Sequence, residues 1–117
     1  MIDLNFNEYQ KRAIATDKFG GGKHDVNEAA FLEKILGLCG EAGEVSDKIK
    51  KIIRDKNGKI EEKDKVEIIK ELGDVLWYDA LIAEYLGFDF DSVAQANLDK
   101  LSSRKSRGKI SGSGDNR

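Results

Sequence analysis

The chain has 117 residues, of which 39% are hydrophobic and 36% are charged, and it contains no proline. One domain is expected at this length. The low hydrophobic fraction argues against a compact monomer with a deep core and favours long amphipathic helices that complete their core by pairing. The 20 basic and 22 acidic residues nearly cancel to a formal charge of −2, so no strong overall field attracts nucleic acid or an anionic membrane.

Hydrophobic spacing predicts four helices joined by short polar or glycine-rich segments. The first is expected over residues 5–18, and the glycines at positions 20–22 end it. The second runs from about residue 27 to residue 54, and its hydrophobic seam repeats about every 3.5 residues, which is typical of a helix that packs against another helix. Asn57-Gly58 predicts the turn that follows.

The third helix, expected over residues 62–86, is apolar or aromatic on nearly all sides from Val75 to Leu86. Such a helix has to be covered on both sides, and one chain of this size offers few partners. We therefore expect a homo-oligomer, either a homodimer or a homotetramer, with this helix near the interface. The central helix of a monomeric bundle is the alternative.

The fourth helix is expected to begin at Asp89 or Asp91 and to end near Arg104, so that residues 1–104 form a single helical domain. Residues 105–117 are a basic tail rich in glycine and serine, without hydrophobic periodicity. We expect this tail to be extended or mobile.

Cysteine usage and the lack of long apolar runs indicate the compartment. Cys39 is the single cysteine, which excludes an intramolecular disulfide and a multi-cysteine zinc site, and we expect it to be buried. Residues 1–20 show no secretory signal, and no stretch approaches the ~20 apolar residues that a membrane span needs. The expected protein is soluble and cytoplasmic, with no membrane partner and no nucleic-acid partner.

Two pairs of carboxylates, Glu41 with Glu44 and Glu71 with Asp74, are spaced i, i+3 on the second and third helices. If these helices are antiparallel neighbours the pairs face each other, because the Asn57-Gly58 turn lies 13 residues after Glu44 and 13 before Glu71. Four carboxylates so placed repel one another unless a cation is bound. An all-oxygen set favours Mg²⁺, with Mn²⁺ as the other candidate ion. The alternative is solvated surface charge.

A second group of polar residues lies on the fourth helix. Asn97, Lys100 and Arg104 step by three and four residues and form one stripe, on which lysine and arginine can hold phosphate oxygens. The alternative is a solvated basic helix end that interacts with the helix dipole. Tyr78 shares the face of the acids and is a candidate for stacking on a base.

At these residues the chain resembles the MazG-like nucleoside triphosphate pyrophosphohydrolases of the all-α NTP pyrophosphatase superfamily. The family signature is Glu-Glu-x-x-Glu, a variable spacer, and Glu-x-x-Asp. Here Gly40-Glu41-Ala42-Gly43-Glu44 carries the last two acids of the first motif, and Glu71-Leu72-Gly73-Asp74 matches the second. Gly40 stands where many members carry the first glutamate, so a five-acid site is absent. The likeness continues through residues 97–104 and the tail at 112–117.

The resemblance implies an all-α bundle of four to five helices completed by homo-oligomerisation. It implies Mg²⁺-dependent hydrolysis of a (d)NTP to (d)NMP and diphosphate, in nucleotide-pool clearance. The implied metal ligands are Glu41, Glu44, Glu71 and Asp74, with Glu41 or Glu44 as the general base. Two alternatives stay open. One is a substrate-specific relative, such as a dUTP or dCTP diphosphatase or a phosphoribosyl-ATP pyrophosphohydrolase. The other is a non-catalytic helical interaction protein.

Overall fold

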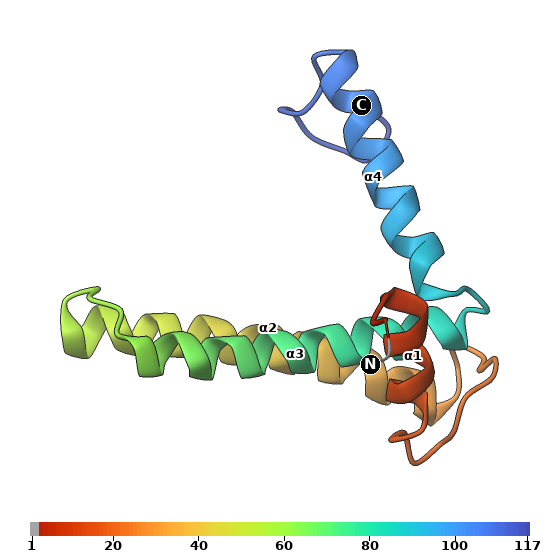
Figure 1. Cartoon of the computed structure of the whole chain (residues 1–117), viewed down its shortest axis with the longest axis horizontal. Coiled ribbons are helices and arrows are strands. Elements are labelled where there is room, and N and C mark those ends of the chain that lie inside the picture. The colour runs from red at the N-terminus through yellow and green to blue at the C-terminus, as the bar shows by residue number, and fades with distance from the viewer. Residues whose placement is uncertain (1–2) are drawn as a thin grey trace.

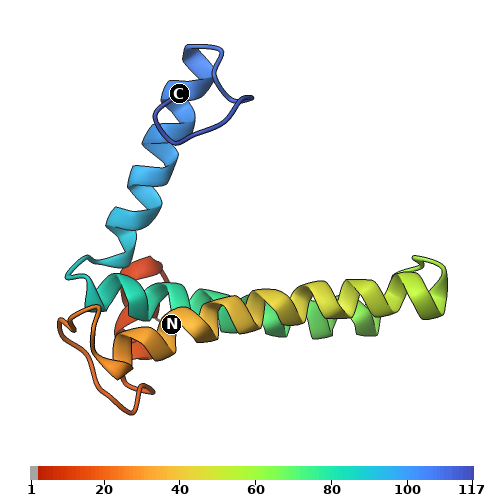
Figure 2. The ribbon, with the colours of Figure 1, turned by 180° about the vertical axis from the view of Figure 1, so that it is seen from behind.

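The computed structural model describes residues 3–117, which form α1 (Phe6–Ile14), α2 (Ala29–Lys56), α3 (Glu62–Tyr85) and α4 (Phe90–Ser106) and contain no strand. The all-α prediction is confirmed. Helices α2 and α3 form a long antiparallel hairpin, α1 packs on α3 near the open end of that hairpin, and α4 projects away from it (Figure 1). The view from behind shows the same separation between α4 and the hairpin (Figure 2). Within the described chain, no helix combines the length and apolarity needed to span a membrane.

The helix ends follow from local side-chain chemistry. The Asn5 side chain caps α1 by accepting a hydrogen bond from the backbone N–H of Glu8 at 2.7 Å, and Asp89 caps α4 by accepting one from Ser92 at 2.9 Å. Helix α2 ends at Lys56, and its C-cap residue Asn57 adopts the left-handed conformation with φ 54°. Asparagine tolerates that conformation better than most residues, so the predicted turn forms at the expected place.

Helix α1 ends at Ile14, whereas the hydrophobic spacing predicted a helix that continues to Lys18. Beyond Ile14 the Asp17 carboxylate enters the core, where it lies 3.1 Å from Nζ of Lys34 and accepts a hydrogen bond from the Tyr85 hydroxyl. The Asp17 and Lys34 side chains are each 1% exposed. This buried pair holds the segment after α1 against α2 and α3, so the chain leaves the helical path early.

The core lies where α1, the start of α2 and the end of α3 meet. Gln10 connects this core to α4: its Nε2 donates to the carbonyl oxygens of Ala80 and Phe88, and its Oε1 accepts from the Phe90 backbone N–H, each at 3.1 Å. A buried amide with all three of these bonds fixes the direction in which the chain enters α4. The buried hydrophobic residues of the core are Ala13, Ala30, Phe31, Ala80, Leu81, Ala83, Tyr85 and Phe90.

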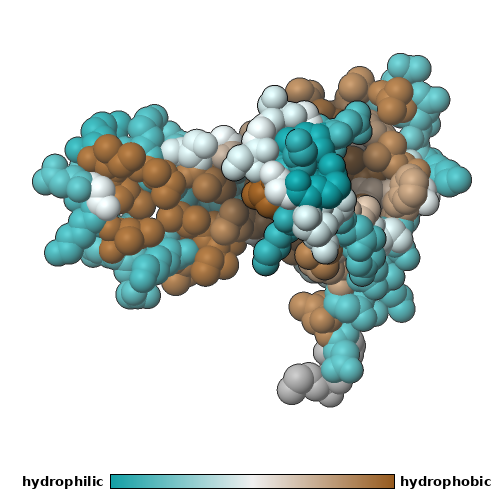
Figure 3. All heavy atoms as spheres, turned by 90° about the horizontal axis from the view of Figure 1, so that it is seen from above, coloured by the Kyte–Doolittle hydropathy of each residue, from teal (hydrophilic) through white to brown (hydrophobic). Residues whose placement is uncertain are grey.

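Away from this core the hydrophobic faces of the α2–α3 hairpin are open. Val66, Ile69 and Leu72 on α3 are 54%, 65% and 51% exposed, and Leu36 and Ile53 on α2 are 72% and 63% exposed. In the space-filling view, hydrophobic atoms gather along the hairpin at the left of the molecule (Figure 3). Two helices alone leave apolar surface of this extent in contact with water, which is typical of an interaction surface.

The tail after α4 turns back on the end of that helix and is not extended. The Arg104 guanidinium donates through Nη2 to the carbonyl oxygen of Asp115 at 2.7 Å. The Arg117 guanidinium donates to the carbonyl oxygens of Lys109 at 3.0 Å and Ile110 at 2.9 Å. Two guanidinium groups therefore organise a segment that has no hydrophobic periodicity of its own.

Candidate metal centre

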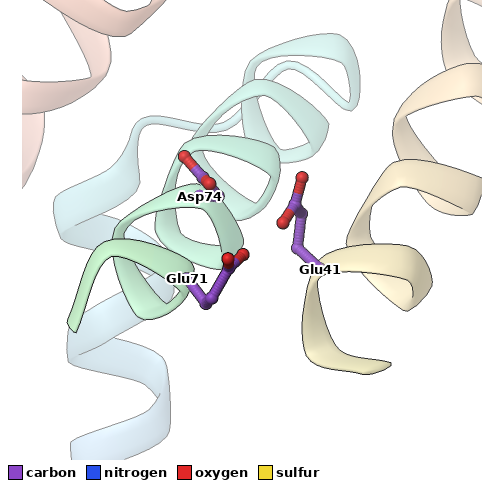
Figure 4. A group of neighbouring side chains, drawn as sticks. All are labelled: Glu41, Glu71 and Asp74. Atoms are coloured by element: carbon purple, nitrogen blue, oxygen red, sulfur yellow. The ribbon is translucent and has the colours of Figure 1, made fainter. Parts of the chain in front are cut away.

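Three carboxylates from two helices meet on the hairpin. Glu41 of α2 and Glu71 and Asp74 of α3 each offer one carboxylate oxygen, and these oxygens all lie within 4.8 Å of one another. Glu41 reaches across from α2 towards the two acids of α3 (Figure 4). The i, i+3 spacing puts Glu71 and Asp74 on one side of α3, and the antiparallel hairpin puts α2 opposite them. We call Glu41, Glu71 and Asp74 the acid cluster.

The acid cluster holds like charges at short range. The pKa of Glu41 is raised, first by a hydrogen bond that its protonated carboxyl donates to Glu71, then by burial and by the charge of Asp74. Lys48 lies near the cluster, with its Nζ 3.7 Å from Oε1 of Glu71. Among residues 3–117 it is the one basic side chain that pairs with any of the three acids. Three acids with one paired lysine leave a net negative charge, which suits a cation.

Glu44 lies one turn of α2 beyond Glu41 and is exposed. Its carboxylate is outside the acid cluster, although its charge contributes to the raised pKa of Glu41. The structure therefore brings together three of the four acids that the two motifs predicted.

The surface around the acid cluster is open because of its glycines. At Gly40, Gly43 and Gly73 a Cβ atom would meet nothing within 4 Å, so no part of the chain from residue 3 onwards packs there. Cys39 is also exposed, and the prediction that it is buried is wrong. The outward face of α2 at this level thus remains accessible. The sequence could not reveal this, because a run of small residues occurs on open and on packed helix faces alike.

Tyr78 follows Asp74 by one turn of α3 and packs its ring against α2, where any side chain at Gly37 would collide with it. Its ring also lies edge-on to the Trp77 ring, with centroids 4.9 Å apart. The Trp77 indole donates to the Thr16 hydroxyl at 2.8 Å. Tyr78 is half-buried, so its ring is held beside the acids by both neighbours.

The stripe on α4 is not brought to the acid cluster within one chain. Among the described residues α4 contacts α1 and α3 but not α2, and it points away from the hairpin (Figure 1). Asn97 and Lys100 line an open cavity of about 670 Å³ on α4. Arg104 is only 5% exposed, because the tail covers it. Its Nε is buried without a hydrogen-bond partner.

Two polar groups near the acids escaped the sequence reasoning. Asp79 is half-buried on α3, and burial raises its pKa. Tyr9 of α1 has a raised pKa, first because of burial and then because of the charges of Asp74 and Asp79. The available signal was Asp79 itself, a charged residue inside the apolar run that begins at Val75.

The buried ion pair of Asp17 and Lys34 was also missed. Burial raises the pKa of Asp17, but hydrogen bonds from Tyr85 and Lys34 outweigh this effect, and the net pKa is below its ordinary value. The pKa of Tyr85 rises to about 12 through burial and its hydrogen bond to Asp17. Since the three residues are far apart in the sequence, no local pattern connects them.

Comparison with known proteins agrees with this geometry. Residues 30–108 match the model of the MazG nucleotide pyrophosphohydrolase domain, a range that includes the acid cluster and the α4 stripe. The chain is 54% identical over 82 residues to the gene 37 protein of Mycobacterium phage L5, a match that covers 70% of this chain and 72% of the phage protein. No solved structure matches the chain significantly. The chain therefore belongs to the MazG nucleotide pyrophosphohydrolase family.

Proposed function

We propose that the protein is a Mg²⁺-dependent nucleoside triphosphate pyrophosphohydrolase that converts a (d)NTP and water to a (d)NMP and diphosphate. Family membership supports a nucleotide substrate. The single observation that carries the proposal is the acid cluster, whose oxygens converge from two helices within 4.8 Å. The biological role we propose is clearance of nucleotides from the cytoplasmic pool.

The donor set fits a hard divalent ion. The acid cluster supplies carboxylate oxygens only, which Mg²⁺ and Mn²⁺ both prefer, and Glu44 can join from the next turn of α2. The pKa of Glu41 is raised first by its hydrogen bond to Glu71, then by burial, and then by the charges of the neighbouring acids, whose repulsion a bound cation relieves. When bound, Mg²⁺ offsets the charge of the triphosphate and makes a water easier to deprotonate.

The protein side chains have distinct proposed roles. Glu41 or Glu44 accepts the proton of the attacking water as general base. Tyr78 lies one turn after Asp74 and offers its ring for stacking on the base. The α4 stripe of Asn97, Lys100 and Arg104 is proposed to hold the phosphates.

We further propose that the protein is a homodimer or a homotetramer. The chain exposes 8232 Å², whereas a compact monomer of 13.0 kDa is expected to expose about 6,300 Å². The excess of about 1,900 Å² per chain is larger than the ~800 Å² that each partner contributes to a standard interface, and it falls in the range of obligate dimers. The open apolar faces of the hairpin supply the chemistry for such an interface.

The test is pyrophosphate release from a panel of common NTPs and dNTPs, with and without Mg²⁺. Glu71→Gln and Asp74→Asn should each abolish release while the helical content is retained. Glu62→Gln is the matched control, because Glu62 is an exposed α3 carboxylate that pairs with Lys65. Release restricted to dUTP or dCTP identifies a substrate-specific relative. If no nucleotide is cleaved with any divalent metal, the protein is a non-catalytic interaction protein and the proposal is wrong.

A further inference from the structure

We propose that the tail competes with phosphate for the α4 stripe: the Asp115 carboxylate occupies Lys100 and Arg104, and an incoming phosphate takes its place and releases the tail. That this phosphate belongs to a nucleoside triphosphate rests on the proposed function. The competition itself does not, and it can be measured with an inorganic anion.

The tail places a negative charge on the two cations of the α4 stripe. The Asp115 carboxylate lies 3.4 Å from Nζ of Lys100 and 3.5 Å from Nη2 of Arg104. The tail loops back beside the end of α4 to reach them (Figure 1). The pKa of Asp115 is lowered, first by its hydrogen bond from Lys100 and then by the charge of that ammonium. A carboxylate held by an ammonium and a guanidinium offers them the same charge and the same kind of acceptor as a phosphate does.

Arg104 is covered while the tail is in place, yet it is incompletely satisfied. The residue is 5% exposed, and its Nε is buried without a hydrogen-bond partner among residues 3–117. The Asp115 carboxylate meets Nη2 alone, whereas a guanidinium can bind a phosphate through two parallel hydrogen bonds. Because a buried donor without a partner is costly, an anion that also accepts from Nε would bind Arg104 better than Asp115 does.

The contacts that hold the tail are polar and exposed, so its release costs little. Arg107 at the end of α4 donates to the carbonyl oxygen of Arg117 at 2.8 Å. The Asp115 side chain is 84% exposed, and Ile110, the one large hydrophobic residue of the tail, is 50% exposed. Exposed ion pairs contribute little stability, and a segment that buries little apolar surface opens easily. Gly108, with φ 67°, joins the tail to α4 and allows the backbone to reorient there.

The charge of this region favours a polyvalent anion over the single carboxylate. Residues 104–117 contain five basic side chains and one acidic one. An inorganic triphosphate carries several negative charges, so it gains more from these cations than Asp115 does. A monovalent anion such as acetate has no such advantage. The competition therefore predicts that polyphosphates release the tail and that simple carboxylates do not.

A spin label on the tail measures its release. In a Cys39→Ser background, Ser113→Cys at an exposed tail position carries a nitroxide label. Inorganic triphosphate with Mg²⁺ should change the label from slow to fast motion, whereas acetate at the same ionic strength should not. If triphosphate leaves the label in slow motion, or acetate releases it equally well, the inference is wrong.

Removal of the Asp115 charge tests the competition directly. Asp115→Asn should lower the half-saturating triphosphate concentration about 2- to 10-fold, because it removes two exposed ion pairs that the anion otherwise has to break. Asp99→Asn is the matched control: it removes the same charge from α4, but the Asp99 carboxylate accepts from Gln95 at 2.9 Å, so the concentration should stay close to that of the wild type. An unchanged or higher concentration in Asp115→Asn would refute the competition.

Steady-state kinetics separate this inference from the proposed function. In active enzyme, Asp115→Asn should lower KM for the nucleotide by a similar factor and leave kcat unchanged, because the tail is closed only in the free protein. If the wild type cleaves no nucleotide yet triphosphate releases the label, the proposed function fails and the competition stands. If the enzyme is active but Asp115→Asn raises KM, the tail assists substrate binding and the inference is wrong.

Discussion

Without a bound metal, repulsion within the acid cluster should destabilise the fold. A variant that lacks one of the three charges should therefore be more stable than the metal-free wild type. Two carboxylates at the 4.8 Å limit repel by about 0.9 kcal/mol with the dielectric constant of water and by about 3.5 kcal/mol at an effective value of 20. Asp74 is exposed and its two neighbours are only partly buried, so the lower limit applies. Asp74→Asn removes two such repulsions, and we expect a gain of about 1–2 kcal/mol in the free energy of unfolding.

Urea and thermal unfolding in EDTA measure this gain, at one fixed protein concentration for all variants. A gain of about 1 kcal/mol corresponds to a rise of roughly 2–8 °C in Tm for chains near this size. Addition of Mg²⁺ should then raise the Tm of the wild type but not that of Asp74→Asn, because binding to the folded state alone shifts the unfolding equilibrium. Glu62→Gln should behave as the wild type in both conditions.

Two results would refute this reasoning. One is that Asp74→Asn unfolds more easily than the wild type in EDTA. The other is that Mg²⁺ stabilises this variant as strongly as it stabilises the wild type. Either result means that the carboxylates do not repel one another as their separation implies, or that no cation is held between α2 and α3.

Three further predictions concern the core and the assembly. Asp17→Ala removes the buried partner of the Lys34 ammonium, which then keeps only the exposed Glu33 carboxylate at 3.2 Å, and should cost about 3 kcal/mol in urea unfolding. Lys34→Met in the same background should recover much of this loss. The stability that Asp17 contributes is present above its unfolded pKa of 3.8 and should be lost as pH falls through its lower folded pKa. The stability that neutral Tyr85 contributes is complete below its unfolded pKa of 10.0 and should disappear as pH rises towards its folded pKa of about 12. Acid and alkaline unfolding curves of the wild type and of Asp17→Asn check both limits. Ile69→Glu places a charge on an open apolar face that is 65% exposed, so light scattering should report a monomer, and an unchanged oligomer would contradict the proposed interface.

The sequence alone determined the helices and the chemistry of the site. Helical periodicity is a local property, so the seam of α2 and the apolar run of α3 were sufficient to predict two long helices. The Asn57-Gly58 turn fixed their register, which places Glu41 opposite Glu71 and Asp74. The spacing of these acids also carried the resemblance to the family that the comparison with known proteins established.

Only the tertiary structure decided which groups meet. Glu44 has the same spacing from Glu41 as Asp74 has from Glu71, yet its carboxylate lies outside the acid cluster. The early end of α1 depends on Asp17, whose partners come from α2 and α3. The direction of α4 depends on hydrogen bonds from α1 to partners that lie 84 positions further along the chain for Asn7 and 78 for Gln10. Such contacts are set by packing and by the need of buried polar groups for partners, which no local pattern records.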